Sequence, residues 1–174
     1  MRGPERGHMA KTKEYIAETL KKAIKGEEDG YTFYDLLMER ATNPDAKRKL
    51  KNLRDDEVRH KHTLVEIFHK HIGPEIGDLP PKGINALAQV FRKGRLEERK
   101  SEMEFINLAI EAELAATRYY QTERDLVDDP EFREVFDSLA EEEHRHYELL
   151  QAEKDAISGN YFWFGLDDTS PLEH

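Results

Sequence analysis

Cysteine is absent from the 174-residue sequence, and glycine, proline and tryptophan are scarce, with 10, 7 and 1 copies. Without cysteine the chain cannot form disulfide bonds, thiolate zinc sites, iron–sulfur clusters or a rubredoxin-type centre. This absence fits a reducing environment, and we expect a cytoplasmic location. No apolar run is long enough to cross a bilayer, so no membrane partner is expected.

Basic residues are also in the minority, because 27 Lys and Arg face 37 Asp and Glu, which gives a formal net charge of −10. A surface of this sign lacks the basic face that nucleic acids require, so we expect no nucleic-acid partner. Residues 1–10 lack the apolar segment of a signal peptide and are expected to be a tag or a disordered N-terminus. The ending Leu172–His174 resembles the remnant of a tag.

The abundant residues favour helices, since Ala, Leu, Glu, Lys and Arg dominate the composition. The sustained alternation of β-branched residues that marks a strand is absent. Apolar residues instead recur at steps of three and four, and proline and glycine interrupt this pattern. Long helices are predicted over about 11–40, 44–71, 98–127 and 131–157, with a short helix over 84–91.

The predicted helices form two pairs with short joints and one long connection between the pairs. Short joints make antiparallel neighbours, and a connection over 73–97 is long enough to carry the chain back along the bundle. We therefore predict an all-α four-helix bundle with one long crossover, built from hairpins 11–72 and 98–157 within a domain of residues 11–158. The aromatic C-terminal tail, 159–174, is expected to pack on the bundle or on a partner chain.

An internal repeat becomes visible when the sequence is shifted by 86 positions. No gap is needed over more than 40 positions, and chance matches between charged helices would not select tyrosine, histidine and proline together. The identical pairs include Ala23 with Ala109, Glu27 with Glu113, Tyr34 with Tyr120, Pro44 with Pro130, Glu57 with Glu143 and His60 with His146. A duplicated helix hairpin with a pseudo-twofold axis follows from this match.

Each half of the repeat carries a glutamate and a histidine three positions apart, with a further glutamate 30 residues upstream. On a helix, side chains at this spacing face the same way and can reach one ion. A single such pair is weak evidence, because most are surface contacts, but a duplicated set predicts a metal site. The predicted ligands are Glu27, Glu57, His60, Glu113, Glu143 and His146.

These polar residues interrupt apolar stripes, as Glu57 and His60 do between Leu53 and Leu64, and they should therefore face the core. Four buried carboxylates with no counter-charge would repel one another. Two divalent cations would balance them, and oxygen ligands with imidazole suit iron or manganese, while zinc could also bind. The pattern is that of di-iron carboxylate bundles.

The sequence resembles the rubrerythrin branch of the ferritin-like superfamily over about residues 11–157. The resemblance rests on four motifs that are specific in combination, EEDGYTFY at 27–34, DEVRH at 56–60, EAELAATRYY at 111–120 and EEHRH at 142–146. It implies that the four-helix bundle is ferritin-like and that Glu57 and Glu143 bridge two metals. It further implies that the remaining ligands bind one metal each, Glu27 and Glu113 as terminal carboxylates with His60 and His146.

The resemblance also implies roles for residues beside the ligands. Asp56 and Glu142 match positions that hold the histidine of the other helix pair through its free ring N–H. Tyr34 and Tyr120 match phenols close to the metals, where they would act in catalysis by donating hydrogen bonds to the oxygen substrate. Core packing with a satisfied hydroxyl is the other interpretation of these two tyrosines.

Two departures from the family pattern bear on activity. Typical rubrerythrins carry a further glutamate three residues after the ligand on the third helix, where this chain has Ala116. They also end in a cysteine-rich rubredoxin domain, and this sequence has no cysteine. Both departures weaken the implied peroxidase activity, and the second requires electrons from a separate protein or a small reductant.

Other carboxylates and imidazoles compete with this assignment. Glu141 and His144 also form a Glu-x-x-His pair, but the repeat aligns His144 with Val58 and so favours the pair of Glu143 and His146. The remaining candidates are interpreted as surface residues, namely Glu28, Glu111, His62, His69 and His71.

Three functions fit such a site. The favoured one is a di-iron oxidoreductase that reduces hydrogen peroxide or oxygen in oxidative stress defence, with an external electron donor such as a rubredoxin-like protein. The alternative is a ferritin-like ferroxidase that stores iron, and the third is a helical scaffold with a structural metal. Manganese or a mixed pair could replace iron. A homodimer is expected, and an exchange of helix pairs between its chains is one arrangement that it could have.

Overall fold

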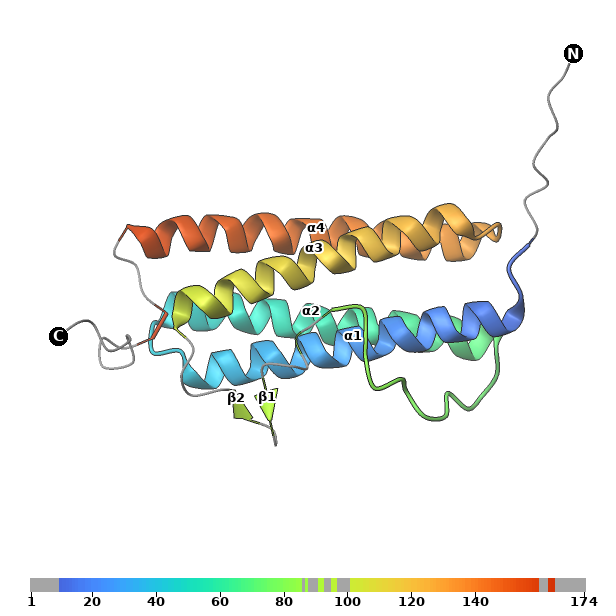
Figure 1. Ribbon diagram of the computed structural model, residues 1–174, viewed down its shortest axis with the longest axis horizontal. Helices are drawn as coiled ribbons and strands as arrows, with labels where there is room; N and C mark the ends of the chain where they lie inside the picture. Colours follow the sequence, from blue (N-terminus) through green and yellow to red (C-terminus); the bar gives the residue numbers. More distant parts are fainter. Residues whose placement is uncertain are drawn as a thin grey trace, which may run out of the picture.

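The computed structural model describes residues 10–85, 87, 91–92, 95–96, 101–159 and 163–164. Its elements in chain order are α1 (Lys13–Arg40), α2 (Pro44–His71), β1 (Phe91–Arg92), β2 (Arg95–Leu96), α3 (Glu102–Leu126) and α4 (Pro130–Ser158). Figure 1 shows α1 beside α2 and α3 beside α4, with a long connection that returns the chain along the bundle. The all-α bundle with one long crossover is therefore confirmed.

The helices begin where the sequence supplies a capping side chain. Asn43 and Asp129, which are counterparts in the repeat, accept hydrogen bonds from first-turn N–H groups of α2 and α4, and a proline follows each of them. Thr12 caps α1 in the same way. Ser101 forms a capping box with Glu104, so α3 begins at the next residue and not near residue 98.

The crossover differs from its prediction. Among the described residues of the predicted 84–91 helix, Ile84 and Asn85 lie in bends, Leu87 has a 3₁₀ conformation and Phe91 lies in β1, so an α-helix is wrong at these positions. Residues 86 and 88–90 lie outside the described residues. The strands β1 and β2 pair antiparallel and were not predicted; with two residues each they are too short for a period to show.

The crossover contacts α1 at two glycines, one in each segment, and these contacts set its path. A Cβ on Gly83 would lie 2.7 Å from the backbone nitrogen of Gly26, and a Cβ on Gly26 would overlap the side chain of Ile84. Neither position has room for a larger residue, because the crossover lies directly against the backbone of α1. The crossover is thereby fixed against the middle of α1, where the predicted ligand Glu27 lies.

Two apolar clusters form the core, one toward each end of the bundle. One includes Phe33, Leu50 and Phe105, and the other includes Leu20 and Phe136, all of them fully buried. Each helix contributes one half of its length to each cluster, because the stripe of every helix is interrupted in its middle by charged residues. The interior of the bundle is thus apolar at both ends and polar at its centre.

The described part of the aromatic tail, Trp163–Phe164, packs on the bundle. The carbonyl oxygen of Trp163 accepts a hydrogen bond from the backbone N–H of Thr42 at 2.9 Å, and its indole N–H donates to Glu153 at 3.1 Å. The guanidinium of Arg40 lies 4.7 Å from the centre of the Phe164 ring. The rest of the tail and residues 1–9 lie outside the described residues.

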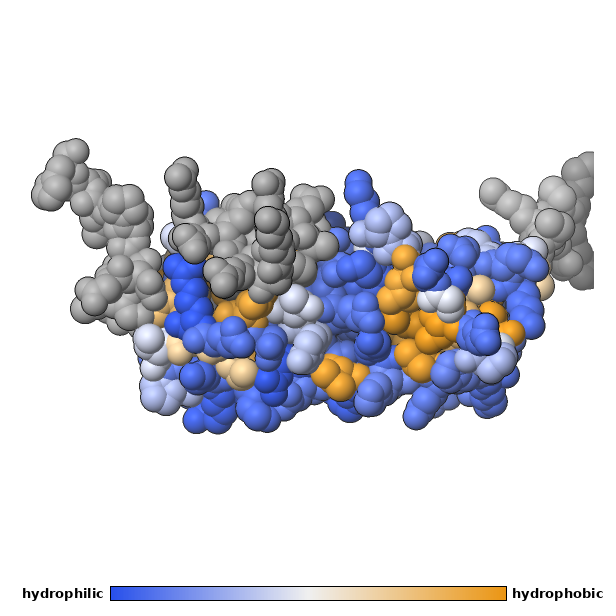
Figure 2. All heavy atoms as spheres, turned by 90° about the horizontal axis from the view of Figure 1, so that it is seen from below, coloured by the Kyte–Doolittle hydropathy of each residue, from blue (hydrophilic) through white to orange (hydrophobic). Residues whose placement is uncertain are grey.

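The surface is largely hydrophilic. Figure 2 shows polar and charged residues over most of one face, with separate apolar patches between them. Among the described residues, each helix is too polar to cross a membrane.

Candidate metal centre

The polar centre of the bundle holds all six of the residues that the sequence predicts as ligands. One comes from α1, one from α3 and two each from α2 and α4, and each keeps at most 7% of its surface exposed. They are Glu27, Glu57, His60, Glu113, Glu143 and His146. The duplicated sequence therefore places equivalent groups from both hairpins in one small volume.

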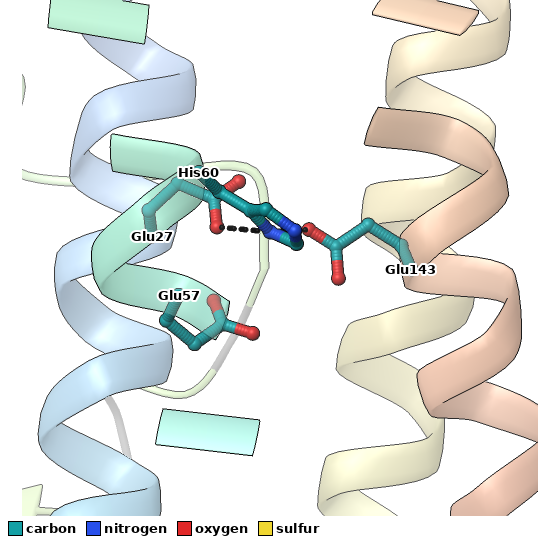
Figure 3. Close-up of side chains that lie close together, drawn as sticks. All are labelled: Glu27, Glu57, His60 and Glu143. Carbon is teal, nitrogen blue, oxygen red and sulfur yellow. Dashed lines mark hydrogen bonds and ion pairs between the residues drawn. The ribbon is translucent and has the colours of Figure 1, made fainter. Parts of the chain in front are cut away.

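The six residues form two overlapping groups that could each hold a metal ion. Potential ligand atoms of Glu27, Glu57, His60 and Glu143 lie within 4.8 Å of one another, as Figure 3 illustrates. The same limit holds for a second group, which consists of Glu57, Glu113, Glu143 and His146. Only Glu57 and Glu143 belong to both groups, so these two carboxylates lie between the two candidate positions.

Both histidines direct their Nδ1 atoms toward these carboxylates. The Nδ1 atom of His60 lies 3.0 Å from an oxygen of Glu143 and 3.3 Å from one of Glu27. The Nδ1 atom of His146 lies 3.2 Å from the other oxygen of Glu143. The rings stack with centres 5.6 Å apart, so the two histidines that correspond in the repeat lie side by side.

The opposite ring nitrogens point outward to the two supporting carboxylates. Nε2 of His60 lies 3.0 Å from Glu142, and Nε2 of His146 lies 3.1 Å from Asp56. Each acid therefore contacts the histidine of the other hairpin, as the family resemblance implies. Such contacts fix the ring orientation and leave the inward nitrogen available as a ligand.

Arg59 connects these two supporting carboxylates. Its Nη2 atom lies 2.7 Å from Asp56 on the same helix and 2.6 Å from Glu142 on α4. One guanidinium thus holds the acids that hold both histidines. The repeat offers a signal for this residue, because Arg59 recurs as Arg145 one position before each histidine.

The two predicted tyrosines also cross between the hairpins. Tyr34 donates a hydrogen bond to Glu113, and Tyr120 donates one to Glu27. Both rings are almost completely buried, and burial followed by the nearby carboxylate charges raises both phenol pKa values well above the usual range. The phenols therefore stay protonated and act as donors to the carboxylates.

Burial and mutual repulsion shift the carboxylates of the centre. Burial raises the pKa of Glu57 well above its usual range, and the charge of Glu143 adds to this rise. Burial and Glu143 likewise raise the pKa of Glu113 to about 7. Burial alone would raise the pKa of Glu143 as well, but hydrogen bonds from both histidines outweigh it and lower that pKa.

The imidazoles are shifted in the opposite sense. Burial disfavours their charged forms, but hydrogen bonds to carboxylates outweigh it and raise the pKa of His60 and of His146. The hydrogen bond from His146 in turn lowers the pKa of Asp56 to about 2. The centre thus concentrates negative charge that protons or cations must neutralise.

A cavity of about 10 Å³ adjoins the four carboxylates of the centre and has room for about one water-sized group. Its lining includes Gly30 and Ala116, together with Asn85 and Leu87 of the crossover. Gly30 and Ala116 are counterparts in the repeat, each three residues after a predicted glutamate ligand. A Cβ on Gly30 would overlap the carboxylate of Glu57, which explains why this position is small.

The donor set fits metal ions of the kind that oxygen and imidazole ligands prefer. One buried carboxylate oxygen of Glu27 accepts no hydrogen bond among the described residues and lies 3.3 Å from Nδ1 of His60, so both atoms are available to one cation. The nearby groups with spare lone pairs are carboxylates and imidazole nitrogens, which are hard or intermediate ligands. Each of the two groups could hold one ion, and two divalent cations would balance the charges of the four carboxylates.

The competing candidates from the sequence lie away from this centre. Glu141 and His144 are exposed, and His144 lies 3.7 Å from Glu148 on the surface. Glu28 pairs with Lys61, also outside the centre. The remaining surface candidates are exposed or only partly buried, as predicted, namely Glu111, His62, His69 and His71.

Comparisons with known proteins agree with this architecture. The model of the family described as Rubrerythrin matches residues 18–154. A hypothetical protein from Pyrococcus furiosus is similar in structure, with a TM-score of 0.74 and 27% identity over 85% of this chain and 93% of that chain. No curated protein matches the chain.

Two ferritin-type structures share the fold. The bacterioferritin-related protein from Bacteroides fragilis, a dodecameric thioferritin, has a TM-score of 0.67 at 14% identity, over 86% of this chain and 89% of that chain. The bacterioferritin of Rhodobacter capsulatus has a TM-score of 0.66 at 18% identity, over 95% and 99%. At these identities the likeness shows the fold alone.

Proposed function

Because the chain belongs to the rubrerythrin family, we propose that it is a di-iron oxidoreductase that reduces hydrogen peroxide or oxygen with electrons from an external donor. The observation that carries this proposal is the pair of four-residue groups that share Glu57 and Glu143. Two shared carboxylates with separate partners on either side are what a dinuclear site requires, whereas a single structural ion needs only one group.

The proposed ligands follow from these groups. Glu27 and His60 would hold one metal, Glu113 and His146 the other, and the shared carboxylates would bridge the two. Asp56 and Glu142 would orient the imidazoles from outside through their contacts with Nε2. We propose iron as the metal, with manganese or a mixed pair as the alternative that the same donors accept.

A bound metal pair would supply the electrons and the Lewis acidity for cleaving an O–O bond. The chain's own residues would control what reaches the centre and in which protonation state. The cavity of about 10 Å³ limits access to very small molecules and keeps bulk water from the carboxylates. Tyr34 and Tyr120, whose O–H groups already point to the centre, would orient a small oxygen substrate by hydrogen bonding.

The proposal extends to partners and location. Since the sequence has no cysteine, the electrons would come from a separate protein, such as a rubredoxin-like one, or from a small reductant. We propose a cytoplasmic protein that serves in oxidative stress defence and forms a homodimer. Exchange of helix pairs between chains would preserve the contacts of the centre, because the first hairpin of one chain would meet the second hairpin of its partner.

Iron oxidation and storage is the second candidate, and the fold shared with bacterioferritin favours it. It would use the same ligands but needs a closed shell of many subunits. Light scattering separates the candidates, because a storage protein would be a very large particle and the proposed oxidoreductase a small oligomer.

The decisive experiment combines metal analysis with rapid kinetics. We expect two iron ions per chain and rapid oxidation of the diferrous protein by hydrogen peroxide in a stopped-flow instrument. Binding of one ion per chain would favour a structural metal. Absence of any reaction between the diferrous protein and peroxide would overturn the proposed function, whatever the metal content.

A further inference from the structure

The two halves of the repeat differ beside the tyrosines that touch the centre. Tyr34 follows Phe33, with ring centres 5.5 Å apart, whereas its counterpart Tyr120 follows Tyr119, with ring centres 5.7 Å apart. The packing is equivalent and both ring pairs meet edge to face. Only the second half therefore places an additional phenol next to the tyrosine of the centre.

The phenols of the second half continue toward the surface. Tyr119 is partly buried and donates a hydrogen bond to the backbone carbonyl oxygen of Thr19 at 2.9 Å. Tyr15 lies one helical turn before Thr19 and is partly exposed. Its O–H donates to a carboxylate oxygen of Glu123 at 2.7 Å, and the charge of Glu123 also acts on Tyr119. Tyr15 and Tyr119 thus share two neighbours.

Within the described part of the chain, the aromatic contacts of the first half do not continue in this way. From Tyr34 the aromatic contacts run to Phe33, then to Phe105 at 6.3 Å and to Phe164 at a further 6.3 Å. A phenol can lose one electron at potentials that proteins tolerate, whereas a phenyl ring cannot. Among the described residues, the ring contact of Tyr120 therefore leads to a second phenol, whereas the ring contacts of Tyr34 lead to phenyl rings.

We propose that Tyr120, Tyr119 and Tyr15 form a relay that carries single electrons from the protein surface to the buried centre. The inner end is Tyr120, which donates its O–H to the predicted ligand Glu27. The outer end is Tyr15, where a partly exposed ring is accessible to a small reductant. This inference rests on the proposed function, because it assumes that peroxide is reduced at the centre.

The relay accounts for both the electron and the proton. The hydroxyl of Tyr15 donates its hydrogen bond to Glu123, a carboxylate that is not part of the centre. Glu123 can therefore accept the phenolic proton as the electron leaves Tyr15. The hydroxyl of Tyr119 donates its hydrogen bond to a backbone carbonyl oxygen, which is too weak a base to take up the phenolic proton. The radical is therefore most stable on Tyr15, and Tyr119 passes the electron between Tyr15 and Tyr120 without remaining oxidised.

The relay acts when the centre can supply only one of the two electrons that peroxide needs. Hydrogen peroxide is then reduced with cleavage of its O–O bond, and it takes up two electrons, together with two protons from solvent, to give two water molecules. A metal held by the proposed ligands would supply one electron, and Tyr15 would supply the other, becoming a neutral phenoxyl radical as its proton moves to Glu123. A one-electron reductant such as a thiol or ascorbate returns the electron, and Glu123 returns the proton.

The test is electron paramagnetic resonance of the iron-loaded protein, frozen shortly after peroxide is added with one reducing equivalent per centre. We expect a tyrosyl radical in the wild type, which ring-deuterated tyrosine identifies by its narrowed signal. Tyr15→Phe and Tyr119→Phe should lose the long-lived radical. Tyr31→Phe, which alters a tyrosine with 40% of its surface exposed, should retain it. Phe33→Tyr should leave the Tyr15 radical unchanged.

Peroxide consumption measured in the same samples separates the two proposals. Consumption together with an undiminished radical in Tyr15→Phe and Tyr119→Phe, or with no radical in the wild type, would overturn the relay alone. Absence of consumption would overturn the proposed function and the relay with it. Mass spectrometry after repeated peroxide additions gives an independent readout, because hydroxylation should accumulate at Tyr15 in the wild type and not in Tyr119→Phe.

Discussion

The Nε2 atom of His146 lies 3.1 Å from Oδ2 of Asp56, so α2 orients a histidine that α4 supplies. The hydrogen bond also lowers the pKa of Asp56 to about 2, and the carboxylate therefore stays ionised at every physiological pH. A permanent negative charge at this position keeps the inward nitrogen electron-rich. The orientation of a proposed ligand thus depends on a residue from the opposite hairpin.

Asp56→Asn should weaken metal binding while leaving the fold intact. The amide keeps the shape of the side chain but loses the charge that orients His146, and changes of this kind cost roughly 10- to 100-fold in affinity. Titration against a chelator would measure the loss. Asp55→Asn is the matched control, because the neighbouring Asp55 pairs with Lys51 and Arg54 on the surface. Equal affinities for the two variants would contradict this role of Asp56.

Gly30→Ala should reduce metal affinity without loss of stability. A Cβ at this position would overlap the carboxylate of Glu57 and lie 2.9 Å from its Cδ, so the glutamate must move. Alanine in a helix is otherwise favoured over glycine by about 1 kcal/mol, so the metal-free variant should unfold no more easily than the wild type. Calorimetric titration with ferrous iron and thermal unfolding would separate the two effects. Gly73→Ala is the control, since a Cβ there meets no atom within 4 Å.

The stability of the metal-free protein should fall as the pH rises from about 4.5 to about 7, because burial and Glu143 raise the pKa of Glu113 over that interval. A carboxyl group with a raised pKa in the folded state favours folding while it is protonated, and this contribution is lost as the pH passes its folded value. His60 and His146, with raised pKa values, add stability below about 6.5 that is lost only at higher pH.

Bound cations replace these protons, so metal affinity should rise over the same pH interval and the loaded protein should keep its stability. Thermal unfolding with and without a chelator, measured across the series, would test both statements. Glu113→Gln should flatten the profile of the metal-free protein. A metal-free protein that gains stability between these pH values would contradict the assignment.

Trp163→Ala should destabilise the protein by about 3–5 kcal/mol, the usual cost of removing a buried large aromatic ring. Only 1% of Trp163 is exposed, and its loss would also leave Glu153 without the indole N–H that it accepts. Urea unfolding followed by circular dichroism would measure the change. Leu149→Ala, at a residue with 36% exposure, should cost no more than about 0.5 kcal/mol. An unchanged midpoint for Trp163→Ala would show that the tail is dispensable.

The helices and the centre were predictable because they depend on local spacing. Prolines and capping residues fix where α2 and α4 begin, and a three-residue step on a helix fixes that Glu57 and His60 face the same way. The repeat then supports each assignment twice, since every predicted ligand in one half has an identical counterpart in the other half. The ferritin-like bundle follows from these constraints without knowledge of long-range contacts.

The crossover and Arg59 were less predictable because they depend on contacts between distant segments. Gly83 and Gly26 are both small for a reason that appears only when the crossover touches α1. Arg59 looks like an ordinary surface residue until α4 brings Glu142 to 2.6 Å from it. Tyr119 likewise gains its significance from Tyr15, which is more than 100 positions away in the chain.

The exchange of contacts between hairpins has a consequence for maturation inside the cell. Each hairpin can form early from local contacts, but Tyr34, Tyr120, Asp56 and Glu142 all reach across to the other hairpin. Closing the two halves forces like charges together, and ligand binding shifts such an equilibrium by mass action. The supply of metal would then determine in how many newly made chains the two hairpins dock completely. Chains without metal would be the first that proteases degrade.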